Sequence, residues 1–330
     1  MTNDRSHVAV PYPAIEPVSP GTVRPFWSVM IPTYHCAEYL GHTLRSVLEQ
    51  ALPADDMQIE VVDDGSVRDD PASVVAEVGQ GRVAFFQQPR NVGPQATFTT
   101  CVRRARGHWV HVLHGDDMVR HGFYQAMRRG SDGNPSIGAA CCRVITIDER
   151  NQWLEMSAPQ QPDAGVLSDP LTRLAVFNHI MFPSVVVRRS AYEQVGGFHP
   201  SLFHSADWDM WKRLAARVPV WYEPEPLALY RIHTRSDTSR LMQTGANIAD
   251  ARHAIDIAEA YLPAADAGAL SRRARRYHGL YAIELARERI RRGDWASARA
   301  QIRAGLRCDP SPRVLAAVLG ALLFRDDHVG

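Results

Sequence analysis

HVLHGDD, residues 111–117, takes an apolar segment directly into two adjacent carboxylates, Asp116 and Asp117. Residues 109–113 have the short apolar pattern of a buried strand, so the carboxylates stand just beyond its end. Two neighbouring negative charges repel each other. A divalent cation, a helix N-terminus or plain solvent could offset this repulsion, and the surrounding sequence indicates which to expect.

The segments around this motif alternate between strand-like and helix-like patterns. In chain order, strand and helix patterns alternate over 27–31, 40–51, 59–62, 71–78, 83–86, 96–106 and 109–113. We expect Gly107 to cap the last of these helices. Such alternation predicts βαβ units with right-handed crossovers, and therefore a parallel sheet covered by helices.

The remainder of the chain is less regular. Further strands are predicted at 138–147, 184–188 and 227–231, helices at 170–179 and 206–217, and a loop at 148–169. From residue 246 onward Ala, Arg, Leu and Glu dominate, which predicts an all-helical region.

The predicted organisation has three parts. Residues 1–25 hold five prolines and few clustered hydrophobic residues, which predicts a tail that is draped on the surface or disordered. Residues 26–240 form the α/β domain, and residues 241–330 form the helical C-terminal region. Residues 291–312 resemble one helical hairpin of the tetratricopeptide type. An ordinary helical hairpin is the alternative, because stable solenoids need several repeats.

Polar side chains follow three of the predicted strands. Tyr34 follows the first strand, Asp63 and Asp64 follow the second, and Asp116 and Asp117 follow the fourth. The carboxyl ends of parallel strands share one edge of a sheet, and ligands bind in the crevice there. The sequence therefore predicts a ligand site at this edge.

The composition narrows the classes of function. A net charge of +1 over 330 residues gives no electrostatic case for binding nucleic acid. Five cysteines without a C-x-x-C spacing argue against a disulfide framework or a zinc site, and they fit a reducing compartment. No long apolar stretch near the N-terminus marks a secretory signal. We therefore expect a cytoplasmic protein, with peripheral association at the inner face of a membrane as a variant of that location.

The most apolar stretch is residues 314–324. It is too short to span a bilayer, which needs ~20 helical residues. It predicts a C-terminal helix packed on the rest of the chain, with an interfacial anchor as the alternative.

Five stretches together carry a resemblance to a known family: WSVMIPTYHCAEYLGHTLRSVLEQ from residue 27, IEVVDDGS from 59, NVG from 91, HGDD from 114 and GGFHPSLFHSADWDMW from 196. In order and spacing they resemble the motifs of family-2 glycosyltransferases over residues 27–233. The resemblance implies the GT-A fold, a Rossmann-like, mostly parallel sheet flanked by helices, here with an all-helical C-terminal extension. It also implies inverting transfer of a sugar from a nucleotide-diphosphate donor to an acceptor hydroxyl. Expected products are cell-surface polysaccharides, glycolipids or glycosylated natural products.

The resemblance implies a set of nucleotide- and sugar-binding positions, namely Pro32, Thr33, Tyr34, Asp63, Asp64, Asn91 and Asp116. The first three would line the base pocket. A carboxylate of the Asp63–Asp64 turn would accept a hydrogen bond from the base or lie beside the ribose, where a wrong base would leave it unpaired. The alternative for this turn is a plain Asp-Gly turn without a ligand.

The resemblance also implies Mg²⁺ or Mn²⁺ bound together with the donor diphosphate. Hard carboxylate oxygens suit these hard cations. Asp117 is the expected metal ligand, and Asp116 would orient the sugar or a nearby water. His233 follows the last strand and could contact the metal or the diphosphate. His114 stands where family members often have Asp, so this position is not assigned to the metal.

The stretch SADWDMW supplies the expected catalytic base. Family members often have Glu-Asp where this chain has Ala206 and Asp207. Asp207 is the first choice for the base that takes the acceptor proton, and Asp209 is the second. The alternative is that Ser205 or Asp207 only caps the helix that follows.

Two other classes of function remain open. A non-catalytic nucleotide-sugar-binding or scaffold protein would use the helical region as its working surface, and the retained Asp117 and Asp207 argue against it. A nucleotidyltransferase could share the sheet and the metal site, but the Gly-rich, basic phosphate loop that it needs is missing near Ile31. The sequence identifies neither the sugar, the base, the oligomeric state nor the acceptor, which could be a glycan, a lipid-linked glycan or a small molecule.

Overall fold

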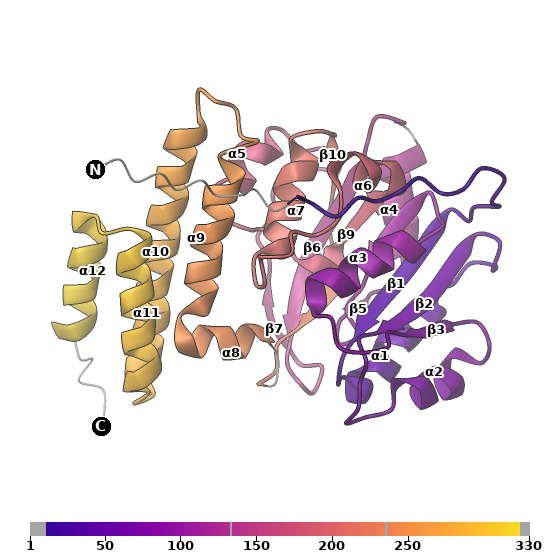
Figure 1. Ribbon diagram of the computed structural model, residues 1–330, viewed down its shortest axis with the longest axis horizontal. Helices are drawn as coiled ribbons and strands as arrows, with labels where there is room; N and C mark the ends of the chain where they lie inside the picture. Colours follow the sequence, from indigo (N-terminus) through magenta and orange to yellow (C-terminus); the bar gives the residue numbers. More distant parts are fainter. Residues whose placement is uncertain (1–10, 133, 235–236, 324–330) are drawn as a thin grey trace.

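The computed structural model describes residues 11–132, 134–234 and 237–323. Its strands are β1 (Trp27–Thr33), β2 (Met57–Asp63), β3 (Ala84–Gln87), β4 (Trp109–Val112), β5 (Met118–Val119), β6 (Ala139–Ile147), β7 (Trp153–Met156), β8 (Gly165–Val166), β9 (Val185–Arg188) and β10 (Val220–Arg231). They form one sheet in the order β3-β2-β1-β4-β9-β6-β10-β5, and β7 and β8 pair with β6 and β10 (Figure 1).

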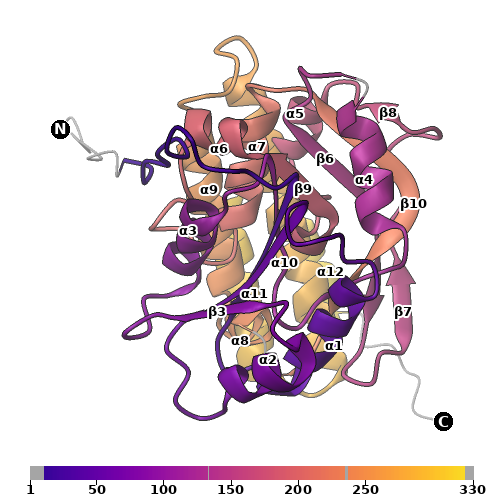
Figure 2. The ribbon, with the colours of Figure 1, turned by 90° about the vertical axis from the view of Figure 1, so that its right-hand side faces the viewer.

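The helices are α1 (Ala37–Leu48), α2 (Pro71–Gly79), α3 (Pro94–Arg104), α4 (Phe123–Asp132), α5 (Pro170–Leu174), the 3-10 turn η1 (Phe182–Ser184), α6 (Arg189–Val195), α7 (Ala206–Ala215), α8 (Asp237–Thr244), α9 (Ala246–Ala258), α10 (Ala267–Arg291), α11 (Trp295–Cys308) and α12 (Pro312–Leu323). Helices α1, α2 and α4 cover one face of the sheet, and α3, α6 and α7 cover the other. Figure 1 shows α9 to α12 stacked beside α7, and in Figure 2 they lie behind the sheet.

The sheet is mixed but mostly parallel. β1 pairs in parallel with β2 and β4, and β2 with β3, as the sequence predicts. β6 and β10 are also parallel to each other, while β9 lies antiparallel between β4 and β6. The carboxyl ends of β1, β2 and β4 therefore meet at one edge of the sheet.

Burial on both faces of the sheet explains the continuous apolar runs from which the strands could be predicted. All seven residues of β1 are buried. Trp27, Val29 and Ile31 pack with α1 and α4, whereas Met30 packs with α3, α6 and α7 on the other face. A strand covered on both faces has a continuous apolar run instead of an alternating one.

Three predicted boundaries are wrong. The predicted loop at 148–169 contains β7 and β8, and the predicted helix at 170–179 is only five residues long. β10 begins at Val220, not at residue 227. Shifts of register on either side of Pro226 keep this strand paired with β6 despite its prolines.

Helices continue from α8 to the end of the described chain, as predicted. α9 contributes Ala251 and Ala254 to the same hydrophobic core as α7, so the helical region shares a core with the sheet. α10 and α11 lie side by side across a short turn (Figure 1). The tetratricopeptide assignment of 291–312 stays a prediction. Within the described residues, no helix is both long and apolar enough to cross a membrane.

The segment 11–25 runs over the α3 and α6 side of the sheet. Gly197 donates its N–H to the Pro13 carbonyl at 2.7 Å, and Ile15 is 4% exposed within the core. The first ten residues of the predicted tail lie outside the described part of the chain.

Gly107 has a different role from the predicted one. α3 ends at Arg104 with Ala105 as its cap, so Gly107 caps no helix. A Cβ at Gly107 would lie 2.7 Å from the backbone nitrogen of Ser28 in β1, and the Gly107 N–H donates to Ser28 Oγ at 2.7 Å. Glycine is required here because the chain between α3 and β4 presses directly on β1.

We predict that Gly107→Ala lowers the free energy of unfolding by about 1–3 kcal/mol, because the added methyl group must displace the β1 backbone. Denaturant titration followed by circular dichroism measures this change. Gly41→Ala in α1 is the matched control, since its Cβ would meet chiefly the flexible end of Arg45. That control should be neutral or more stable by about 0.5–1 kcal/mol. Equal effects of the two substitutions would contradict the assigned role of Gly107.

Candidate active site

The HGDD turn is held between the end of β1 and helix α1. Gly115 donates its N–H to the Pro32 carbonyl at 3.0 Å, and Thr43 Oγ1 donates to the carbonyls of Gly115 and Asp117 at 3.0 and 2.7 Å. A Cβ on Gly115 would lie 2.9 Å from Cys36 Sγ. Only glycine therefore lets the turn approach the end of β1 this closely.

Asp117 is almost fully buried, with 1% of its surface exposed. Its Oδ1 accepts a hydrogen bond from the Arg231 backbone N–H at 2.9 Å, and Arg231 Nε donates to the Asp116 carbonyl at 2.8 Å. The other oxygen, Oδ2, is buried without a hydrogen-bond partner, because His114 Nδ1 at 3.8 Å is too distant. A buried carboxylate oxygen without a donor is rare and needs an explanation such as an ion.

The two neighbouring carboxyl groups differ in their environments. Burial and the charge of Asp116 raise the pKa of Asp117 well above its usual value. Burial also acts to raise the pKa of Asp116, but the hydrogen bond from His233 and the charges of His114 and His233 outweigh it and lower this pKa. The Asp116 Oδ2 accepts from His233 Nε2 at 3.0 Å. Without added positive charge, the structure thus favours a state in which only one of the two carboxyl groups is ionised.

The residues at this turn fit a divalent cation. One ligand atom from each of His114, Asp116 and Asp117 lies within 4.8 Å of the other two. Asp117 Oδ2 and His114 Nε2 are buried without partners. Hard carboxylate oxygens and a neutral imidazole suit Mg²⁺ or Mn²⁺. The predicted ligand His233 lies outside this group of three, and its Nε2 is occupied by Asp116.

The Asp63–Asp64 turn meets the end of β1 as predicted. Thr33 pairs with Asp63 in the sheet, and Asp64 donates its N–H to the Thr33 carbonyl at 2.9 Å. The Asp64 carboxylate accepts from the N–H groups of Val92 and Gly93 at 2.8 and 3.0 Å, and from Gln88 at 2.9 Å. Because a carboxylate has about four acceptor positions, one remains for a ligand.

Asp63 is occupied in a similar way. Its carboxylate accepts from the backbone N–H and hydroxyl of Ser66 and from Gln87. The hydrogen bonds of Asp63 are therefore those of a plain turn, which was the alternative to a role in ligand binding. Asp63 is fully buried and Asp64 is 3% exposed, so Asp64 has the better access of the two.

The other predicted nucleotide-binding positions divide by exposure. Pro32 and Thr33 are buried, and Thr33 Oγ1 lies 2.8 Å from Cys36 Sγ. Tyr34 is 46% exposed and Asn91 is exposed. A ligand at this edge can reach the side chains of Tyr34 and Asn91, whereas Pro32 and Thr33 shape the edge through their backbone.

The two candidates for the base have different surroundings. Asp209 is completely buried and accepts from Arg213 Nε at 2.8 Å, from the Tyr261 hydroxyl at 2.9 Å and from the Tyr12 hydroxyl at 3.3 Å. Asp207 is only half-buried, and its Oδ2 accepts from Asn178 Nδ2 at 3.0 Å. Asp209 thus connects three segments of the fold, whereas Asp207 remains available to a substrate.

Asp207 has the proton affinity of a base that works near neutral pH. Burial raises its pKa to about 7, although hydrogen bonds from Trp208 and Asn178 oppose this rise. The helix that carries Asp207 also lies near the HGDD turn, because the Phe182 ring contacts both His114 of the turn, with 4.3 Å between ring centroids, and Trp211 of α7, with 5.5 Å.

Two residues that position Asp207 were missed in the sequence. Asn178 lies between α5 and η1, and Asp250 lies in α9. The Asp250 carboxylate accepts from the consecutive N–H groups of residues 203–205, just before α7. Neither residue belongs to a motif. A polar Asn-His pair within an apolar stretch at 177–180 was the only available signal for the first.

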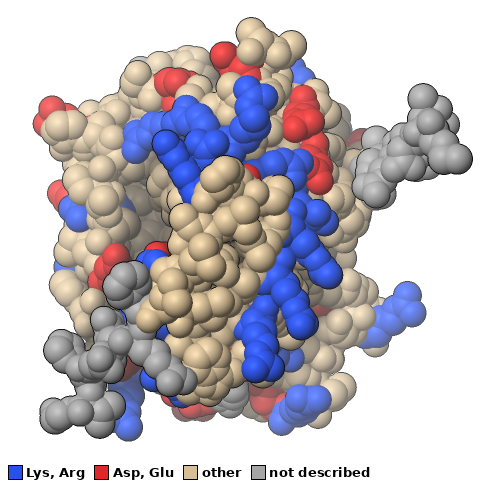
Figure 3. All heavy atoms as spheres, turned by 90° about the vertical axis from the view of Figure 1, so that its left-hand side faces the viewer, with Lys and Arg blue, Asp and Glu red and all other residues tan. Residues whose placement is uncertain are grey.

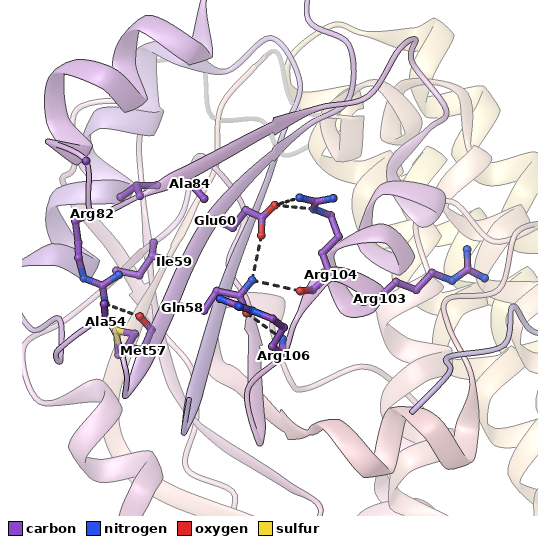
Figure 4. A pocket seen from close by; sticks show the side chains of 12 residues that line it. Ala54, Met57, Gln58, Ile59, Glu60, Arg82, Ala84, Arg103, Arg104 and Arg106 are labelled. Atoms are coloured by element: carbon purple, nitrogen blue, oxygen red, sulfur yellow. Dashed lines mark hydrogen bonds and ion pairs between the residues drawn. The ribbon is translucent and has the colours of Figure 1, made fainter. Parts of the chain in front are cut away.

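A separate cavity of about 640 Å³ opens at the opposite, amino-terminal ends of β2 and β3 (Figure 4). Two of the arginines that line it, Arg82 and Arg104, are held by the protein itself. Arg104 Nε donates to Glu60 at 2.6 Å, and Arg82 donates to the carbonyls of Leu52 and Met57. This cavity is not part of the site at the carboxyl edge.

The site thus combines two features at the carboxyl edge of an α/β sheet. The HGDD turn carries carboxylates that suit a cation, and Asp207, whose pKa is raised, lies on a helix near it. The family model for Glycosyl transferase family 2 matches residues 28–196, just over half of the chain. The chain therefore belongs to this family of enzymes, and the predicted family is confirmed.

Known proteins agree with this assignment at the level of sequence and fold. An uncharacterized protein of Mycobacterium tuberculosis is 29% identical over 252 residues, 73% of this chain and 78% of that protein. The fold is similar to that of S. aureus TarS in complex with UDP-GlcNAc, with a TM-score of 0.62 and 14% identity over 90% of this chain and 79% of that one. It is also similar to mannosyltransferase PcManGT of Pyrobaculum calidifontis in complex with GDP-Man and Mn2+, with a TM-score of 0.57 and 17% identity over 96% and 84% of the two chains. The predicted GT-A fold is thus confirmed.

We predict losses of stability of very different size for the two Asp-to-Asn substitutions in α7. Asp209→Asn leaves Arg213 buried without its charge partner, so the free energy of unfolding should fall by about 3–5 kcal/mol. Asp207→Asn should cost far less. Thermal and denaturant unfolding of both variants measure the difference, and a larger loss for Asp207→Asn would contradict the assignment.

The stability of Asp207→Asn relative to the natural chain should also depend on pH. The folded-state pKa of Asp207 is about 7, raised above the value of 3.8 for an unperturbed carboxyl. The folded chain therefore binds the extra proton between these values, and its stability falls as the pH rises from about 4 to 7. Between pH 5 and pH 8 the comparison should shift in favour of Asp207→Asn, by about 1–3 kcal/mol. A constant difference across this range would contradict a raised pKa.

Proposed function

We propose that this chain is a metal-dependent, inverting glycosyltransferase that moves a sugar from a nucleotide-diphosphate donor to an acceptor hydroxyl. The observation that carries the proposal is Asp117 Oδ2, which is buried without a hydrogen-bond partner beside a second carboxylate. Membership of the family supports the class of reaction. The products that we expect are cell-surface polysaccharides, glycolipids or glycosylated natural products.

Asp117, Asp116 and the adjacent His114 would hold Mg²⁺ or Mn²⁺. The bound cation would supply positive charge to the diphosphate as it leaves. Asp116 also faces outward enough to orient the sugar, since 26% of its side chain is exposed. His233 steadies Asp116 through Nε2, and its buried, unpartnered Nδ1 is the atom left for the predicted contact with metal or diphosphate.

The donor base would lie against Tyr34, between the ends of β1 and β2. Asp64 would offer its remaining acceptor position to the base or ribose. Asn91 would approach the ribose or diphosphate, because Asp64 holds the N–H groups of Val92 and Gly93 in that loop. TarS was solved with UDP-GlcNAc and PcManGT with GDP-Man, so uridine and guanosine donors are the first to test.

Asp207 would act as the base. It would take the proton from the acceptor hydroxyl while that oxygen bonds to the anomeric carbon and the bond from this carbon to the diphosphate oxygen breaks. The attacking and leaving oxygens lie on opposite faces of the sugar, so the anomeric configuration inverts. A base with a pKa of about 7 is suited to this transfer, because it is partly ionised at neutral pH and still holds a proton well.

Aromatic side chains beside Asp207 would receive the acceptor. Phe177 stacks on Tyr277 of α10 with 4.8 Å between ring centroids, and Tyr281 continues the row. Tyr277 is 40% exposed and Tyr281 is 37% exposed. Exposed rings with a polar edge suit the apolar face and hydroxyls of a glycan, a lipid-linked glycan or a small molecule.

The proposed location is the cytoplasm, with peripheral association at the inner face of a membrane. All five cysteines are free, which supports a reducing compartment. We also propose that residues 26–240 form the catalytic domain, between the 1–25 tail and the helical 241–330 region.

A thermal-shift panel of sugar nucleotides and nucleoside diphosphates, with and without Mn²⁺, tests donor binding. We predict that one nucleoside class raises the melting temperature only with the cation, because the cation binds together with the diphosphate. Asp117→Asn should remove the Mn²⁺-dependent part of the shift and lower cation-dependent donor hydrolysis by at least about 100-fold.

Asp163→Asn is the matched control, because Asp163 is an exposed carboxylate outside the site. It should bind and react as the natural chain does. Unchanged turnover in Asp117→Asn would contradict the site. Release of pyrophosphate from nucleoside triphosphates would instead indicate a nucleotidyltransferase, and donor binding without any turnover would indicate a scaffold protein.

A further inference from the structure

The positive charge of this protein is concentrated at its C-terminal end. Residues 267–323 carry twelve arginines and four carboxylates, a formal charge of +8, whereas the whole chain carries +1. α10, α11 and α12 therefore form a basic region attached to an acidic remainder. Such an asymmetry predicts an interaction with a negatively charged partner.

One face of α12 is apolar and uncovered. Val314 and Ala321 are buried against the neighbouring helices. On the outer side, the exposed fractions are 47% for Leu315, 59% for Leu319, 51% for Leu322 and 76% for Leu323. Their spacing of three and four residues places them in one stripe along the helix. The prediction that this helix packs on the rest of the chain is thus confirmed for its inner face only.

Helix α11, which contacts α12, carries a row of exposed arginines. Arg299, Arg303 and Arg307 recur every fourth residue of α11, and all three are exposed. Among the described residues, no ion pair joins any of them to a carboxylate. Figure 3 views this end of the molecule and shows an uncharged strip flanked by basic side chains, with few acidic ones near it. The arginines are therefore available to an external anion.

We infer that the leucine stripe of α12 and the exposed arginines of α11 form a docking surface for an anionic lipid bilayer. An interfacial helix buries its apolar side at the boundary of headgroups and acyl chains, while nearby arginines pair with lipid phosphates. A second copy of this chain is a poor occupant, because it would bring a +8 surface against another +8 surface. A nucleic acid would leave the leucines exposed to water. The inference rests on these helices and is independent of the proposed reaction.

Cosedimentation of the full chain with lipid vesicles tests the inference. The two probes are vesicles of phosphatidylcholine alone and vesicles that contain about 30 mol% phosphatidylglycerol. We expect binding to the anionic vesicles to be at least about tenfold tighter, and to weaken in about 0.5 M salt because screening reduces the attraction. Equal binding to both vesicle types, or no binding to either, would overturn the inference.

Two sets of variants separate the roles of charge and leucine. Arg299→Gln/Arg303→Gln/Arg307→Gln should weaken binding to anionic vesicles by at least about tenfold, and Leu319→Ser/Leu322→Ser should do the same. Matched controls are Arg68→Gln/Arg150→Gln/Arg217→Gln and Leu154→Ser, which alter exposed residues elsewhere. All variants should keep the natural melting temperature, because the altered side chains are exposed. Equal losses in the controls would overturn the assignment of this surface.

Discussion

Burying the Asp117 carboxylate is unfavourable, and the contacts that the chain provides offset this only in part. The Arg231 N–H satisfies one oxygen, and the other has no donor. The backbone at Gly115 and the hydroxyl of Thr43 nevertheless fix the turn in this position. A protein that keeps a carboxylate buried, raises its pKa and places a second carboxylate beside it has a natural use for a cation there.

This constraint explains how distant parts of the chain are arranged. Arg231 ends β10 and reaches back to the Asp116 carbonyl, so the last strand of the sheet defines the position of the turn after β4. Asp250 of α9 holds the N–H groups that precede α7, so the helical region helps to aim the proposed base. The C-terminal helices thus belong to the architecture of the site, and their outer surface carries the arginines and leucines described above.

The sequence predicted the parallel half of the sheet well, because β1, β2 and β4 are buried on both faces and their apolar runs are continuous. It missed the first half of β10, residues 220–226, where register shifts beside Pro226 keep the strand paired with β6. The carboxylates at the sheet edge could be predicted from their place after strands. The order of Asp207 before Asp209 came from the resemblance alone, because both lie in the first turn of α7 and the physical difference between them is in the tertiary partners Arg213 and Tyr261, which no local pattern shows. Asn178 and Asp250 have no local signal at all.

Anomalous diffraction from crystals grown with Mn²⁺ and the nucleoside diphosphate that stabilises the chain would locate the cation relative to the Asp117 carboxylate. We predict an anomalous peak within bonding distance of Asp117 Oδ2, with the diphosphate on the far side of the ion. A bound nucleotide without a peak at this oxygen, or an Asp117 Oδ2 that is paired with a donor from the protein, would contradict it.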